Sequence, residues 1–386
     1  MTKKIYHKLA VALFALAVLF SFCACSDETN EDTHAVLKQN ILKQYVSHVI
    51  SPTYSQLAAQ AEQLVVDLQS LRQQPTDAHV QAACATFLEA RACWEKSEAF
   101  LFGPASDFGI DPHIDSWPLD EDAFNIMMAN NAQINAMDND EGDVYAGDHL
   151  GNSLLGFHGL EYILFENGSP KPAASISDKE LVYAIAVAGD LRNHCYQLEV
   201  SWMGDEAPVA HVQKVEELEY NTTVNGSNNS YGDNMVNAGT PGSTYASTIN
   251  ALMSIIDGCN TIVDEVGTSK IGKPYHGEDV HYIESPYSQK SIQDFYDNII
   301  SVQNAYMGGV EGERNSDLSV HYFINKLDAA VDSRVLAAID NSLAKIAGMK
   351  APFVQNYTDA TAKAAIDALA ELDDALSAAY DVLRNE

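Results

Sequence analysis

The chain has 386 residues, of which 54 are acidic and 22 are lysine or arginine, so its formal net charge is −32 at pH 7. A field of this sign repels phosphate backbones, which argues against nucleic-acid binding, and it raises the local concentration of cations. The length leaves room for one large or two medium domains with a real hydrophobic core.

The first 24 residues have the pattern of a lipoprotein signal peptide. Three lysines precede the apolar stretch 9–20, which is shorter than the ~20 residues needed to span a bilayer. A small residue precedes Cys25, so we expect Cys25 to carry the lipid and residues 25–33 to form a polar tether. The anchor predicts an outer-membrane lipoprotein that faces the periplasm or the cell surface. Plain cleavage into a soluble exported protein is the alternative.

Amphipathic helical spacing dominates the chain after the tether, and no sustained alternation of period two indicates strands. The first helix is expected over 35–71, with a kink or a break at Pro52. Asp77 opens the next helix, which Gly103 stops. Residues 103–119 are too rich in Gly, Pro and Asp to form a regular element. Further helices are expected from 152 or 153 to 165 and over 178–202, 243–266, 288–306, 318–347 and 359–383.

A long polar stretch divides the chain. Residues 219–243 hold Asn, Gly, Ser, Thr and Tyr with few apolar residues, which indicates a loop or a domain connection. We therefore expect an all-α protein of two helical bundles. The N-terminal domain is expected at 34–204, the connection at 205–243 and the C-terminal domain at 244–386.

The cysteines do not indicate a thiolate metal site. Four remain after Cys25, namely Cys84, Cys93, Cys195 and Cys259, and none belongs to a CxxC pair. We expect them to be separate buried thiols.

One short run could carry metal chemistry. His158 and Glu161 stand three residues apart within GFHGLE (156–161), so on a helix they project from the same face. An imidazole and a carboxylate so placed can bind one cation, as in the Glu-x-x-His pairs of helical di-iron bundles. Gly156 and Gly159 indicate close approach by another segment or a ligand. A purely structural His–Glu pair is the alternative.

Further metal donors occur earlier in the chain. Glu98 ends the second expected helix beside the irregular stretch 103–119, which holds Asp107, Asp111, His113 and Asp115. Such a density of oxygen and nitrogen donors is unusual for a connector. Some of these residues serve only as turn formers, as Asp111 does before Pro112.

Several runs, in this order and spacing, resemble the imelysin family. They are WEKSEAFLFGP (94–104), IDSWPLD (114–120), GFHGLEYILF (156–165) and ESPYS (284–288), the last followed by Ser291, Asp294 and Phe295. The resemblance covers nearly all of the chain after the tether, and the GxHxxE signature is intact. It implies two helical-bundle domains with the GxHxxE helix, and a cleft, at their junction.

The resemblance also implies site residues and a choice of functions. His158 and Glu161 match the metal pair of the family, and Glu98 and Asp115 match acids expected beside it. The cleft around them is expected to include Gly156, Trp117, Glu284 and Ser285. The family contains proteins described as insulin-cleaving peptidases, iron-regulated proteins, and the periplasmic iron-binding component of a ferrous uptake system.

The pattern of metal ligands helps to distinguish a zinc peptidase from an iron-binding protein. A zinc peptidase usually takes its ligands from HExxH or HxxEH. The chain has no HExxH, and Tyr162 stands where HxxEH would need its second histidine. One imidazole among carboxylates suits iron better than a structural zinc, with zinc or another divalent ion as alternatives. Because imidazole must be neutral to bind a metal, occupancy is expected to fall below about pH 6.5.

The favoured hypothesis is an exported lipoprotein that binds iron and takes part in iron uptake, with components of an uptake system as partners. A metallopeptidase is one alternative, which leaves enzymatic activity open. A surface ligand-binding lipoprotein whose cleft holds no metal is the other.

Overall fold

The computed structural model describes residues 28–386 apart from residue 226, with side chains from residue 34 onward. Cys25 and the predicted signal segment lie outside the described residues. Within the described range, no helix is both long and apolar enough to cross a membrane.

The described chain is all-α, as predicted. In the first part of the chain the helices are α2 (Glu28–Tyr45), α3 (Ser51–Gln73), α4 (Asp77–Glu95), α5 (Pro104–Asp107), α6 (Ile110–Ile114), α7 (Glu121–Ala129), α8 (Asn131–Met137), α9 (Gly142–His149), α10 (Gly156–Leu164), α11 (Asp178–Met203), α12 (Val209–Glu217) and α13 (Tyr231–Val236). They are followed by α14 (Thr248–Asp264), α15 (Gly272–His276), α16 (Ser291–Met307), α17 (Val320–Leu327), α18 (Ala329–Ala347), α19 (Phe353–Asn356) and α20 (Ala360–Arg384). The strands β1 (Phe165–Glu166) and β2 (Ser169–Pro170) form one short antiparallel hairpin.

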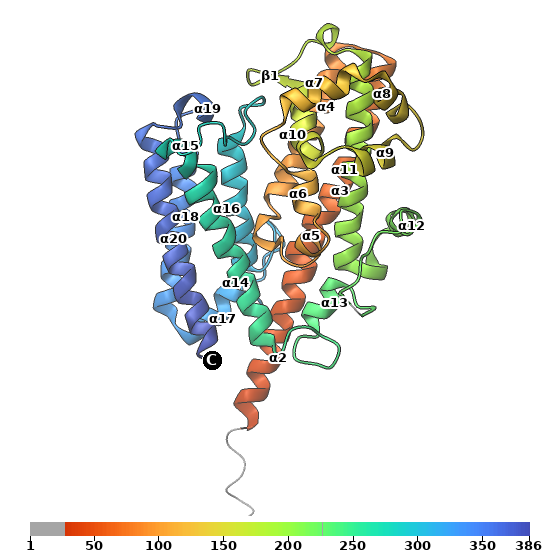
Figure 1. Ribbon diagram of the computed structural model, residues 1–386. Coiled ribbons are helices and arrows are strands. Elements are labelled where there is room, and N and C mark those ends of the chain that lie inside the picture. The colour runs from red at the N-terminus through yellow and green to blue at the C-terminus, as the bar shows by residue number, and fades with distance from the viewer. Residues whose placement is uncertain (1–27, 226) are drawn as a thin grey trace, which may run out of the picture.

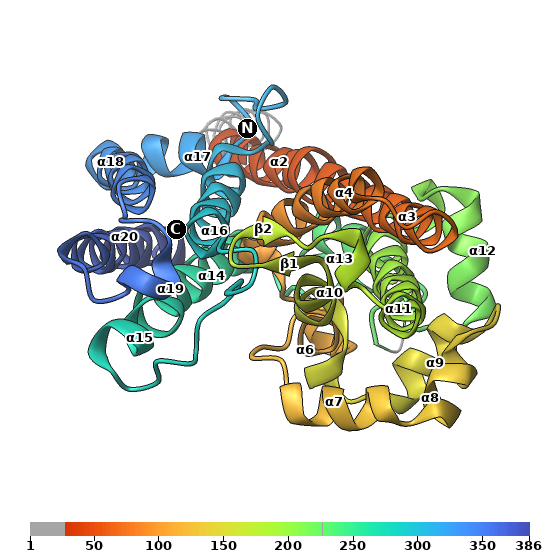
Figure 2. The ribbon, with the colours of Figure 1, turned by 90° about the horizontal axis from the view of Figure 1, so that it is seen from above.

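The helices form two groups that lie side by side (Figures 1 and 2). In the first group, α3, α9 and α10 pack against the long helix α11, and α4 packs against α3. In the second group, α14 and α18 pack against α20, and α16 packs against α14 and α18. Because α2 also contacts α14 and α4 contacts α16, the buried apolar side chains form one continuous cluster across both groups.

Local signals account for the longest helices. Ser177 and Glu180 form a capping box at the start of α11, which satisfies two backbone N–H groups that would otherwise lack partners. Asp359 accepts a hydrogen bond from the Thr361 N–H at the start of α20. The break expected at Pro52 takes the form of a π-helical segment over Val46–Ile50, directly before α3, whose second residue is Pro52.

The structure differs from the predicted elements in several places. Residues 103–119 contain the single-turn helices α5 and α6, and the stretch 219–243 contains α13, whose Tyr231 and Met235 are buried. The helix expected over 318–347 divides at Asp328, whose carboxylate accepts hydrogen bonds from the first N–H groups of α18. The helices α7, α8 and α9 were not predicted. They are short, and each buries only a few side chains, so the sequence carries little periodicity there.

The four cysteines within the described residues are buried and free, as expected.

Candidate metal centre

Two glycines allow the GxHxxE helix to sit deep in the protein. Gly156, the first residue of α10, has a φ of 67°, and a Cβ atom there would lie 1.8 Å from the Ile114 carbonyl oxygen. A Cβ atom on Gly159 would lie 2.2 Å from the Tyr183 hydroxyl. Larger residues at either position would therefore push α10 away from α6 or α11. The helix begins at Gly156, not at Asn152 or Ser153 as predicted, because a separate 3-10 turn occupies residues 152–154.

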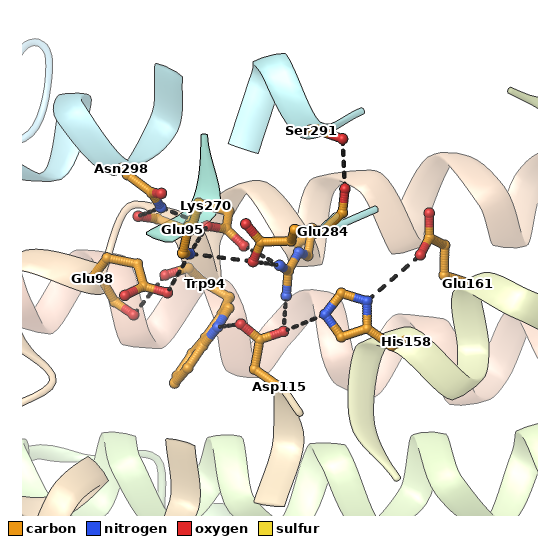
Figure 3. Close-up of polar contacts among 12 residues, drawn as sticks. Trp94, Glu95, Glu98, Asp115, His158, Glu161, Lys270, Glu284, Ser291 and Asn298 are labelled. Atoms are coloured by element: carbon orange, nitrogen blue, oxygen red, sulfur yellow. Dashed lines mark hydrogen bonds and ion pairs between the residues drawn. The ribbon is translucent and has the colours of Figure 1, made fainter. Parts of the chain in front are cut away.

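The His158 ring lies between two carboxylates (Figure 3). Its Nε2 atom is 3.1 Å from Asp115 Oδ1, and its Nδ1 atom is 3.6 Å from Glu161 Oε2. The other oxygen of Glu161 accepts a hydrogen bond of 2.7 Å from the Ser288 backbone N–H. Burial opposes protonation of the ring, but the interactions with Asp115 and Glu161 outweigh it and raise the pKa of His158 to about 9.

Asp115 connects this histidine to α4. The Arg91 guanidinium donates to Asp115, and the Trp94 indole donates a hydrogen bond of 2.7 Å to its other oxygen. Burial alone would raise the pKa of Asp115, but Arg91 and His158 hold it well below its usual range. The Asp115 carboxylate is therefore ionised, with cationic or polar partners at both oxygens.

Two buried cations that the sequence did not single out join the remaining acids. Arg91 Nη2 lies 2.5 Å from Glu95 Oε1 and 2.5 Å from Glu284 Oε1. Lys270 Nζ lies 3.2 Å from Glu284, 3.6 Å from Glu98 and 3.7 Å from Glu95. Lys270 ends a π-helical segment over 265–270, far from Arg91 in sequence. The four-residue spacing of Arg91 and Glu95 on one face of α4 could have indicated their ion pair. No sequence pattern near Lys270 indicated its contacts with these acids.

Carboxyl groups outnumber permanent cations in this buried cluster. Among the described residues, five acids (Glu95, Glu98, Asp115, Glu284 and Asp294) lie around the two permanent cations Arg91 and Lys270, and a sixth, Glu161, faces His158. Burial, together with neighbouring acids, raises the pKa values of Glu95 and Glu98 well above the usual range and that of Asp294 to about 7. These carboxyl groups therefore favour the protonated, neutral form in the absence of a further cation.

The structure brings most of the predicted site residues together. Asp115, His158 and Glu284 each offer a ligand atom within 4.8 Å of the others, and Glu95, Glu98 and Asp115 do the same. Glu161 lies on the opposite side of the imidazole from Asp115. The Trp117 ring lies 5.8 Å from that of His158, between centroids, and Lys270 Nζ lies 5.2 Å from the Trp117 ring centroid. Ser285 is buried next to Glu284, in a left-handed backbone conformation.

Two cavities reach the cluster from the surface. One, of about 430 Å³, is lined by His158 and Trp117 from the first group of helices and by Tyr287 and Val354 from the second part of the chain. The other, of about 260 Å³, is lined by Glu98, Asp111, Asp115 and Glu265, among others. The cluster thus has an apolar approach next to His158 and an acidic approach next to Asp115.

Comparisons with known proteins agree with this architecture. The imelysin family model, Peptidase M75, matches residues 50–379. Iron-regulated protein A of Synechococcus elongatus is 27% identical over 302 residues, which cover 78% of this chain and 72% of that protein.

Two solved structures resemble the whole fold. An iron-regulated protein A precursor from Parabacteroides distasonis is 26% identical, with a TM-score of 0.72 over 90% of this chain and 95% of that one. An imelysin-like protein from Psychrobacter arcticum, at 14% identity, shares the fold with a TM-score of 0.58 over 90% of this chain and 93% of its own. The chain belongs to the imelysin family.

Proposed function

We propose that the buried cluster binds one metal ion, with His158, Asp115 and Glu284 as ligands. The observation that carries this proposal is the excess of carboxyl groups over permanent cations in a buried site. Burial disfavours the ionised form of these groups, and a bound cation would stabilise the carboxylates, with release of their protons. Glu284 Oε2 is buried without a hydrogen-bond partner among the described residues, so it is free to bind a metal.

Glu161 has a positioning role in this arrangement. If Nδ1–H of His158 donates to Glu161, the lone pair of Nε2 is directed toward Asp115, where the metal would lie. Carboxylates hold metal-binding histidines in this way in many proteins. The Ser288 N–H fixes Glu161 in turn. The predicted pair thus divides into a ligand, His158, and the group that orients it, Glu161. The carboxyl groups of Glu98 and Glu95 would ionise next to the bound ion.

The ligand types favour iron. One imidazole nitrogen with carboxylate oxygens suits ferrous or ferric iron, whereas a structural zinc usually has more nitrogen or sulfur ligands. Two relatives are named iron-regulated proteins, which supports an iron-related role. Zinc or another divalent ion remains the alternative.

We propose that the protein takes part in iron uptake at the outer membrane. Cys25 would carry a lipid that anchors the chain there, facing the periplasm or the cell surface, and components of an uptake system would be its partners. The negative charge of the chain would concentrate cations around it.

Calorimetric titration of the purified full chain with ferrous, ferric and zinc ions tests the proposal. His158→Ala removes the nitrogen ligand. Glu161→Gln preserves the shape of the Glu161 side chain but removes the negative charge that orients His158. Both should weaken binding at the centre, Glu161→Gln by roughly 10- to 100-fold. His34→Ala is the control, since His34 contacts Glu386 far from the centre. Equal affinity in wild type and both variants would contradict the proposal.

The same proteins test the peptidase alternative. Metal-dependent cleavage of a peptide substrate that Glu161→Gln abolishes would assign the centre to a metallopeptidase instead.

A further inference from the structure

A second group of metal donors lies outside the buried centre, between α6 and α11. His113 Nε2 is 2.8 Å from Asp190 Oδ2, and His194 Nδ1 is 3.4 Å from Asp190 Oδ1. Asp190 and His194 are one turn apart on α11, whereas His113 comes from α6, which packs against it. Each of the three residues offers a ligand atom within 4.8 Å of the others.

The fold holds the carboxylate rigidly and leaves the imidazoles accessible. Asp190 has only 1% of its side chain exposed, while His113 and His194 have 17% and 12% exposed. A Cβ atom on Gly147 would lie 2.3 Å from Asp190 Oδ1, so the backbone of α9 covers the carboxylate closely. A solvent molecule or a further ligand can therefore approach from the histidine side.

The two imidazole rings lie close together beside the carboxylate. The ring centroids of His113 and His194 are 4.1 Å apart, with the ring planes tilted by 35°. His194 Nδ1 also lies 3.1 Å from the backbone oxygen of Asp190. Imidazole is the commonest metal ligand in proteins, and here two of them converge on one buried carboxylate.

The spacing also fits a metal ion. Two ligands of a tetrahedral zinc ion, each 2.0–2.2 Å from the metal, are about 3.3–3.6 Å apart. The separation of 3.4 Å between His194 and Asp190 lies in that range, whereas the 2.8 Å between His113 and Asp190 is a hydrogen-bond distance that would lengthen when an ion binds. Two imidazoles and one carboxylate, with an open position, are a ligand set for zinc and for ferrous iron.

We propose that His113, Asp190 and His194 form a second metal site, for a divalent transition metal such as zinc. An ion bound there would tie α6 to α11. The inference does not rest on the proposed function, because none of the three residues is a ligand of that centre.

Zinc and cobalt titrations of the full chain test the proposal. Wild type should bind two ions, and His194→Gln and His158→Ala should each bind one. His149→Gln, a histidine on α9 outside both sites, is the matched control and should behave as wild type. Because His194 is partly buried, circular dichroism checks the fold of each variant, and His113→Gln, on the single-turn helix α6, provides a second variant.

The His158→Ala variant with bound cobalt should show the visible absorption of a site with imidazole ligands. The double variant His158→Ala, His194→Gln should lack this absorption. One ion in wild type, lost with His194→Gln but kept with His158→Ala, would support this site and contradict the buried centre. Unchanged stoichiometry and affinity in both His194→Gln and His113→Gln would overturn the second site.

Discussion

Lowering the pH from 8 to 6 should weaken zinc binding at the His158 centre by roughly 100-fold. A metal must displace the proton of His158, whose pKa the flanking carboxylates raise to about 9. With that pKa, the neutral fraction of the imidazole falls about 90-fold between pH 8 and pH 6, whereas an unperturbed histidine, with a pKa near 6.5, would lose only about 4-fold. The sequence alone predicted a loss of occupancy only below about pH 6.5, because the pattern HxxE does not reveal Asp115 on the other side of the ring.

Competition with a chelator of known affinity at pH 6, 7 and 8 measures this dependence. His194→Gln is carried in every protein so that the second site does not contribute. Asp115→Asn should flatten the curve, because it removes one of the two carboxylates that hold the proton on His158. A change of about 4-fold or less in the parent chain would refute the reasoning about His158.

Three further predictions concern stability, anchoring and chain mobility. Arg91→Met should lower the free energy of unfolding by about 3–5 kcal/mol in urea denaturation, because it leaves Glu95, Asp115 and Glu284 buried without their shared cation; a loss below about 1 kcal/mol would contradict this. Cys25→Ala should release the protein from the membrane fraction. If Cys25→Ala stays bound and Cys23→Ala, at the cysteine two residues earlier, is released, the assignment to Cys25 is wrong. Native proteolysis should cut first within the exposed residues 239–242, and cleavage confined to other segments would be the contrary result.

Local sequence patterns were sufficient to predict features that are formed within a single helix. The three-residue spacing of His158 and Glu161 placed both side chains on one face of α10, and the alanine-rich pattern of α20 predicted a helix whose observed limits differ by one residue at each end. In both cases the determining contacts lie within a few residues of sequence.

The rest of the centre depends on contacts between distant segments. Lys270 contacts Glu95 on α4 and also Glu284. Arg91 on α4 contacts both Asp115 and Glu284, and Glu284 is 193 residues further along the chain than Arg91. No periodicity in one chain segment encodes such pairings. The opposite placement of Asp115 and Glu161 around His158 likewise follows from the packing of α6 on α10, which the two glycines permit.

Crystallography with anomalous scattering tests the metal centre most directly. Crystals of the full chain grown with ferrous or zinc ions should show an anomalous peak about 2.0–2.2 Å from His158 Nε2, within reach of the carboxylates of Asp115 and Glu284. Glu161 should still contact Nδ1. A map from metal-containing crystals with no peak between these three residues, and with Arg91 and Lys270 as the only cations among the acids, would contradict the account.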